Sequence, residues 1–231
     1  MSSYTPTISA LLEKVKESSD VRPSSSSKLL IISQPNTPGL SRIPGTTKEV
    51  NAILKTVGRG LGESLSLEGE AATVERVKLE MESCSSIHFA CHANQNMESP
   101  LSSGFYLHDG QLELADIMKQ RIAHCEFSFL SACQTGTGDE KLSEEAVHLA
   151  AGMLAVGYQG VVATMWSIKD QYGPVVAEGF YKYLAEKRET DRLHGNGAAH
   201  ALHHTIQGIR KTLGDTEQGL LTWVPYVHFG F

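Results

Sequence analysis

Clustered positive charge and long apolar runs are both scarce in this sequence. Lys and Arg number 20 against 26 Asp and Glu, so the formal net charge is -6. A nucleic-acid backbone is bound by clustered cations that displace counterions, and the acidic balance argues against such a partner. The sequence also has no run of about 18 apolar residues, the length that a membrane-spanning helix needs. We therefore expect neither nucleic acid nor a membrane as a partner.

Cysteine is sparse too, with only 4 residues in the chain. Cys84, Cys91, Cys125 and Cys133 lack the paired CxxC spacing of a structural zinc site. A chain of this length buries enough surface to fold without disulfides, so a reducing compartment fits better. Residues 1–18 contain acids and lack the unbroken apolar core of a secretory signal. Together these features predict a cytoplasmic location.

The first 27 residues differ in composition from the rest of the chain. Apolar residues at helical spacing over 1–17 predict a short helix, and the Ser-rich stretch 18–27 predicts a linker. The chain as a whole is 41% hydrophobic, which is ample for one large α/β domain. We expect that domain to span residues 28–231.

Short apolar runs alternate with helical patterns along this domain, which is typical of a parallel sheet covered on both faces. The expected fold class is therefore α/β: a three-layer sandwich with a mainly parallel, six-stranded sheet between helices. A turn at Asp109-Gly110 indicates a hairpin over 104–114, and Pro225 places the last strand at an edge. The expected strands are 29–33, 65–67, 86–92, 127–133, 160–166 and 223–230. The expected helices are 46–57, 70–82, 115–120, 143–155, 171–187 and 197–213.

Two reactive residues stand at the ends of expected strands. His92 ends the third strand, and Cys133 ends the fourth, just before a glycine-rich turn that contains Gly136 and Gly138. If these strands are neighbours, their ends lie about 5 Å apart, and an imidazole there can activate a thiol. The glycines leave room for a substrate backbone. From spacing alone, a buried inert cysteine is the commoner arrangement, so both interpretations stay open.

Five segments in this order resemble the CHAT family of caspase-like domains, which often accompany tetratricopeptide repeats. They are HFACH at 88–92, PLS at 100–102, LHDGQLELADI at 107–117, SACQTGTGDE at 131–140 and VVATMWSIKD at 161–170. The resemblance implies a caspase–haemoglobinase fold and a cysteine endopeptidase that needs no metal or organic cofactor. It implies a peptide or protein as substrate and a regulatory module, such as tetratricopeptide repeats, as a further partner.

The resemblance also implies roles for individual residues. His92 aligns with the general base of the family, and Cys133 aligns with the nucleophile. The backbone N–H groups of Ala93 and Cys133 are the implied oxyanion donors. His88 and Cys91 precede the position of the base, so we interpret them as residues that pack the strand.

Two departures from related patterns bear on activity and specificity. Many family members have glycine where this chain has Ala93, and a β carbon there costs about 1 kcal/mol if φ is positive. This keeps open an alternative function, a catalytically weak or silent module that acts as a signalling or assembly scaffold. A flavodoxin-like nucleotide binder is a further rival. Ser131 and Ala132 replace the acidic residue that precedes the nucleophile in metacaspases, so specificity for Arg or Lys is not assumed.

Several other residues are weaker candidates. Trp166 either walls a substrate side-chain pocket or packs in the core. Asp170 either lines the substrate cleft or caps the helix that begins near Tyr172, and capping is the commoner role. The histidines at 200, 203 and 204 have a spacing that can bind zinc, but no catalytic Glu or fourth ligand accompanies them. We therefore expect no metal site.

Overall fold

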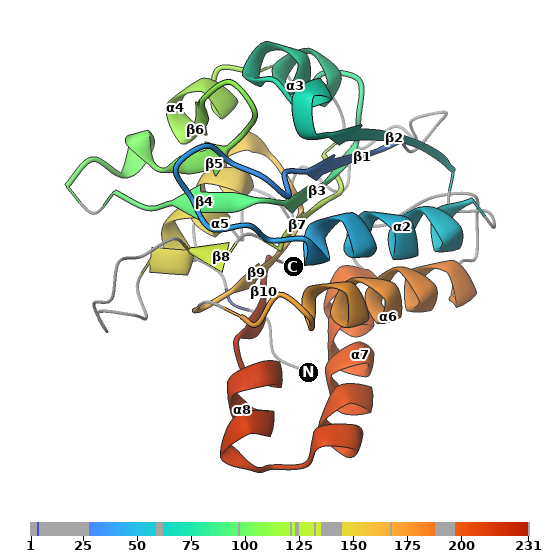
Figure 1. Cartoon of the computed structure of the whole chain (residues 1–231). Coiled ribbons are helices and arrows are strands. Elements are labelled where there is room, and N and C mark those ends of the chain that lie inside the picture. Colours follow the sequence, from blue (N-terminus) through green and yellow to red (C-terminus); the bar gives the residue numbers. More distant parts are fainter. Residues whose placement is uncertain are drawn as a thin grey trace.

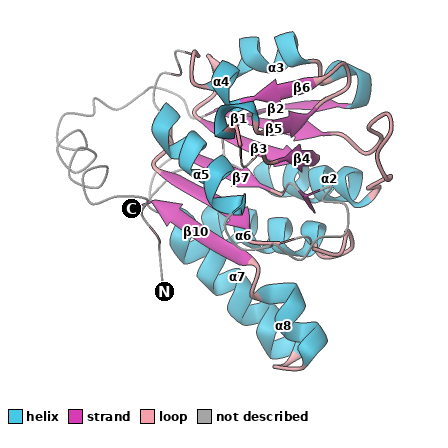
Figure 2. Ribbon diagram, turned by 90° about the vertical axis from the view of Figure 1, so that its left-hand side faces the viewer, coloured by secondary structure: helices cyan, strands magenta, loops and turns pink. Residues whose placement is uncertain are grey.

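The computed structural model in Figure 1 shows a central sheet with helices packed on both of its faces. The same layers are seen from the side in Figure 2. The structure describes residues 4, 28–58, 62–96, 98–120, 122, 125–131, 133–134, 145–166, 168–187 and 197–230. The predicted N-terminal helix and Ser-rich linker lie outside these residues, apart from Tyr4, whose backbone forms a bridge to Phe229.

The main sheet has six strands in the order β10-β9-β7-β3-β1-β2. Every neighbouring pair is parallel except β10 with β9. The prediction of a mainly parallel six-stranded sheet is therefore confirmed, as is the edge position of the last strand. The strands are β1 (Lys28–Ser33), β2 (Glu63–Glu68), β3 (Ser86–Ala90), β7 (Phe127–Leu130), β9 (Gly160–Thr164) and β10 (Tyr226–Gly230).

Helices cover both faces of this sheet because its buried strands carry apolar residues on both sides. In β1, Leu29 and Ile31 pack against one set of helices, whereas Leu30 and Ile32 pack against the other. The first set is α2 (Gly45–Val57), α6 (Gly173–Glu186) and α7 (Ala198–Leu213). The second set is α3 (Val74–Met81), α4 (Leu114–Ile117) and α5 (Glu145–Val156). No helix in the described part of the chain is long and apolar enough to cross a membrane.

A second, smaller sheet was not predicted from the sequence. Its strands are β4 (His92–Asn94), β5 (Gly104–Tyr106), β6 (Gln111–Glu113) and β8 (Cys133–Gln134), in the order β6-β5-β4-β8. The predicted strands 86–92 and 127–133 are each too long, since the chain leaves the main sheet after β3 and β7 and enters the small sheet. The apolar pattern continues through both breaks, so it does not reveal them.

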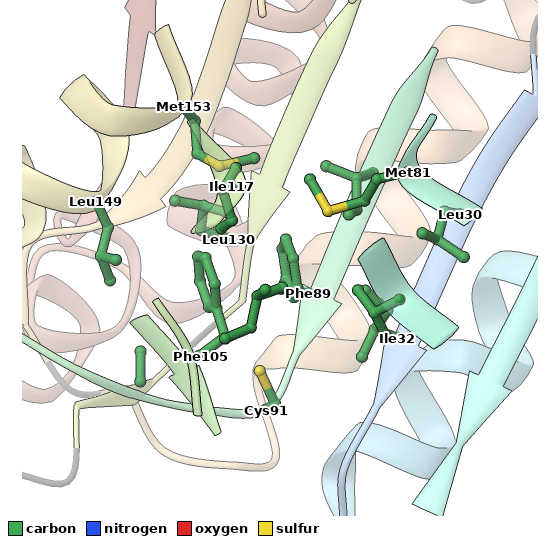
Figure 3. Packing of buried hydrophobic residues seen from close by; sticks show 14 of the residues in the cluster. Leu30, Ile32, Met81, Phe89, Cys91, Phe105, Ile117, Leu130, Leu149 and Met153 are labelled. Carbon is green, nitrogen blue, oxygen red and sulfur yellow. The ribbon is translucent and has the colours of Figure 1, made fainter. Parts of the chain in front are cut away.

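The two sheets are joined by aromatic packing. Phe89 of β3 stacks on Phe105 of β5, with ring centroids 4.0 Å apart and planes inclined by 5° (Figure 3). Close contact between the hairpin strands requires Gly104, because a β carbon there would lie 2.2 Å from the carbonyl oxygen of Leu112. The hairpin over 104–114 is thus confirmed, and it anchors the small sheet to the core.

Several element boundaries differ from prediction. Helix α3 starts at Val74 rather than residue 70, because the Thr73 side chain accepts from the backbone N–H of Arg76 and caps it there. Residues Gly69–Ala71 form a short 3-10 helix instead, as do Pro100–Ser102. Helix α8 (Glu217–Trp223) was not predicted: residues 217–222 had no expected element, and Trp223 was expected in the last strand.

Candidate active site

His92 and Cys133 occupy paired positions in the small sheet. Strands β4 and β8 are parallel, with His92 opposite Cys133 and Ala93 opposite Gln134. Hydrogen-bonded strands run about 4.8 Å apart, so the backbones of the two candidates are immediate neighbours. Their preceding strands β3 and β7 also pair in the main sheet, where Phe89 lies opposite Leu130. The condition set by the sequence analysis, that the two strands be neighbours, is met.

The imidazole of His92 is held by a backbone carbonyl. Its ring is buried, and Nε2 lies 2.7 Å from the carbonyl oxygen of Ser41. A carbonyl only accepts, so Nε2 carries the proton and donates it. Among the described residues, Nδ1 has no hydrogen-bond partner. With the proton on Nε2, the lone pair of the imidazole is on Nδ1, as a general base requires.

Sequence reasoning missed the part played by Ser41. The residue lies in the loop between β1 and α2, within the proline-rich segment 35–45, where neither a strand nor a helix was expected. The contact uses the main-chain oxygen, which every residue type has. No motif signals such a contact, and only the path of the loop reveals it.

Ala93 lies within strand β4, where it pairs with Phe105 on one side and Gln134 on the other. Its backbone is therefore extended, with the negative φ that all L residues adopt in strands. The penalty considered for alanine in place of glycine applies only at positive φ. The departure from the family pattern therefore introduces no backbone strain at this position.

A buried chain of hydrogen bonds runs beneath the paired strands. Tyr181 Oη lies 3.1 Å from His88 Nδ1, and His88 Nε2 lies 3.1 Å from Glu49 Oε1. The other carboxylate oxygen of Glu49 accepts from Ser131 Oγ at 3.0 Å. All four side chains are buried, and they come from α6, β3, α2 and the end of β7. His88 thus does more than pack the strand, the only role that the sequence analysis assigned to it.

One assignment of protons satisfies every member of this chain. Tyr181 donates to His88 Nδ1, His88 donates through Nε2 to Glu49, and Ser131 donates to the same carboxylate. Burial raises the pKa of Tyr181 well above its usual value, and the nearby charge of Glu49 raises it further. The phenol therefore keeps the proton that it must donate.

The three weaker cleft candidates have separate outcomes. Asp170 does cap a helix, but not the one that follows it: Oδ2 accepts the N–H of Gly45 at 2.7 Å, at the start of α2. Trp166 follows strand β9 and is partly buried, and its Nε1 has no partner among the described residues. Gly136 lies outside the described residues.

The histidines of α7 form no metal site in the described part of the chain. No group of three or more metal-binding side chains was found there. His200, His203 and His204 are exposed, and His204 packs on Tyr183 with ring centroids 4.9 Å apart.

Three of the cysteines are buried: Cys84, Cys91 and Cys125. Cys91 points into the apolar cluster between the sheet and its helices (Figure 3), as expected for a residue that packs the strand. Burial raises the pKa of Cys84, so its thiol is poorly nucleophilic at neutral pH.

The family model described as the CHAT domain matches residues 1–231 of this chain. The chain belongs to the CHAT domain family. No curated protein matches this CHAT domain. Two solved structures have a similar fold, and each match covers 89% of the CHAT domain. The first is the crystal structure of the Arg-specific cysteine proteinase gingipain R, with a TM-score of 0.57 and 14% identity.

The second solved structure is the complex of the pro- and mature domains of RgpB from Porphyromonas gingivalis, with a TM-score of 0.55 and 11% identity. The CHAT domain covers 46% and 47% of the two matched chains, so it spans about half their length. At these identities the likeness concerns the fold. The fold is therefore the caspase-like α/β sandwich of cysteine peptidases, as the resemblance implied.

Proposed function

We propose that this CHAT domain is a cysteine endopeptidase in which Cys133 is the nucleophile and His92 the general acid and base. The observation that carries the proposal is the parallel pairing of His92 with Cys133. The fixed tautomer of His92 supports it, because the bond from Nε2 to Ser41 leaves Nδ1 as the basic nitrogen. Catalysis by a thiol needs an imidazole within reach, and the two backbones are adjacent.

The proposed reaction has two steps. In the first, His92 Nδ1 takes the thiol proton of Cys133, and the sulfur attacks the carbonyl carbon of the scissile peptide bond. The new C–S bond forms as the C–N bond breaks, and His92 returns its proton to the leaving amine. In the second step, water attacks the thioester, giving a carboxylic acid and restoring the thiol.

The developing oxyanion requires hydrogen-bond donors that are already in place. We assign this role to the backbone N–H groups of Ala93 and Cys133, which belong to the two paired strands.

Gly136 and Trp166 remain candidates for the substrate cleft. We place the protein in the cytoplasm, because the chain has few cysteines and is long enough to fold without disulfides. The proposed partners are a protein substrate and a regulatory module such as tetratricopeptide repeats.

Cleavage of a peptide library before and after Cys133→Ala tests the proposal. We expect the wild-type chain to cleave a subset of peptides and Cys133→Ala to abolish cleavage. Cys125→Ala is the matched control, because it also removes one thiol but at a buried site to which no role is assigned. Cleavage that survives Cys133→Ala would exclude this nucleophile. A wild-type chain that cleaves nothing and whose Cys133 resists alkylation would favour the scaffold function instead.

A further inference from the structure

The carboxylate of Glu49 lies at the junction of four elements, far from solvent. Its side chain is only 3% exposed, and both oxygens are engaged, one by His88 and the other by Ser131. Burying a carboxylate has a large desolvation cost, and replacing buried ionic groups by apolar residues is often neutral or stabilising. Stability alone therefore does not explain an acidic residue here.

Each of the helices α2 and α6 begins next to a carboxylate that comes from the other helix or from the loop before it. Asp170, just before α6, accepts the N–H of Gly45 at the start of α2. Glu49 of α2 lies against the start of α6, since a β carbon on Gly173 would come within 2.8 Å of Glu49 Oε2. An anion is favourable at a helix N-terminus. The two carboxylates thus fix the position of α2 relative to α6.

Residues in α2 and in the loop before it contact His92 itself and the chain two residues before Cys133. The carbonyl of Ser41 holds the ring of His92, and Glu49 holds the hydroxyl of Ser131. Ser131 lies between the last residue of β7 and the first residue of β8, where the chain passes from the main sheet to the small one. This hydrogen bond therefore anchors the chain two residues before Cys133.

We propose that Glu49 and Ser131 are positioning residues, which hold the segment that carries Cys133 in register with His92. The inference rests on the proposed function and goes beyond it, because neither residue touches the reacting atoms. The carboxylate of Glu49 is held in the core by its contacts with His88 and with the start of α6. The Ser131 hydroxyl connects the nucleophile segment to that point, while the loop before α2 connects the base to the same helix.

Removing the Ser131 hydroxyl tests this role directly. In Ser131→Ala we expect kcat for a cleaved peptide to fall by a factor on the order of 10 to 100, since small displacements at a reacting centre have effects of that size. KM should change by less than about twofold, because the substrate itself is not contacted. The rate at which iodoacetamide alkylates Cys133 should fall too, with its pH profile shifted upward as the thiol loses the influence of His92. Ser131→Thr keeps the hydroxyl and should restore both readouts.

Tyr181→Phe is the matched control. It removes one hydroxyl from the other end of the same hydrogen-bond chain, so it tests whether the effect is a general loosening of the core. We expect a similar loss of stability in urea but a kcat and an alkylation profile within about twofold of wild type. Equal loss of kcat in both variants would overturn the positioning role.

The alkylation readout separates this inference from the proposed function. A wild-type Cys133 that is neither reactive nor needed for cleavage overturns the peptidase and the positioning role with it. A reactive wild type whose kcat and alkylation profile are unchanged by Ser131→Ala overturns the positioning role alone. Glu49→Gln gives a second measurement, because it keeps the shape of the side chain but replaces one acceptor oxygen by a donor, and it should lower kcat in the same way as Ser131→Ala.

Discussion

Asp170 caps a helix that begins 125 residues earlier in the sequence: its Oδ2 accepts the backbone N–H of Gly45 at 2.7 Å. Pro44, which precedes α2, cannot supply a capping side chain, and among the described residues none adjacent in sequence does so. A residue from the loop after β9 performs that role instead. The bond connects the start of α2 to the loop that leads into α6, on the same side of the sheet as His92.

Replacing Asp170 should destabilise the fold through loss of this cap. For Asp170→Ala we expect the free energy of unfolding to fall by about 1 kcal/mol, the usual cost of losing a capping side chain. Asp170→Asn keeps an acceptor oxygen and should recover most of the loss. Urea denaturation of the three proteins measures the difference. Equal stability of Asp170→Ala and wild type would show that the bond to Gly45 contributes nothing.

Gly173 should be intolerant of a side chain, whereas Gly208 should not. A β carbon on Gly173 would lie 2.8 Å from Glu49 Oε2, and the carboxylate has no freedom to move because His88 and Ser131 hold it. We expect Gly173→Ala to cost about 1–2 kcal/mol through a broken buried hydrogen bond. Gly208 is exposed within α7 with nothing within 4 Å, so Gly208→Ala should stabilise by about 0.5–1 kcal/mol. Opposite shifts in the urea midpoint confirm the contrast.

The sequence predicted the main sheet better than the site. Buried parallel strands such as β1 read as continuous apolar runs, and α2, α6 and α7 follow from helical spacing. The small sheet did not follow, because β8 has only 2 residues and a strand that short leaves no periodic pattern. His92 and Cys133 were still indicated by their positions at the ends of expected strands, because the carboxyl ends of parallel strands lie at the same edge of a sheet.

The supporting residues of the site were beyond sequence reasoning for a different reason. Ser41 acts through its backbone, and Glu49 belongs to no motif, so its role follows only from the fold, which places His88 and Ser131 against it. Asp170 was recognised as a capping residue, but local reasoning assigned it to the next helix along the chain. Contacts between residues far apart in sequence follow from the packing of whole elements, which no short window contains.

Selective alkylation should distinguish the four cysteines. At pH 7 we expect iodoacetamide to modify Cys133 first, because a neighbouring imidazole favours the thiolate. Cys84 should react much more slowly, since burial raises the pKa of its thiol. Mass spectrometry of the digested protein measures labelling at each site, and labelling in urea provides the fully reactive reference. Labelling of Cys133 no faster than of Cys84 in the folded protein would argue against an activated thiol.

His228 should make the fold sensitive to mild acid. Its ring is buried in β10, and burial lowers its pKa from 6.5 to about 4. Between these two values the unfolded chain binds a proton that the folded chain does not, so the free energy of unfolding decreases as pH falls through this window. The full loss is about 3 kcal/mol and is complete near pH 4. At pH 7 the ring is neutral in both states, and the effect is absent.

Urea denaturation at a series of pH values between 7 and 4.5 tests this effect against His228→Gln. The variant loses the titrating ring, so its stability should fall less steeply over the same range, even if it starts lower at pH 7. His200→Gln is the control, because His200 is exposed on α7 and its removal should leave the steep slope of the wild type unchanged. Parallel curves for wild type and His228→Gln would mean that His228 is protonated equally in both states. In that case the buried site in β10 accommodates the protonated ring. Any acid sensitivity of the fold then arises from other titratable groups.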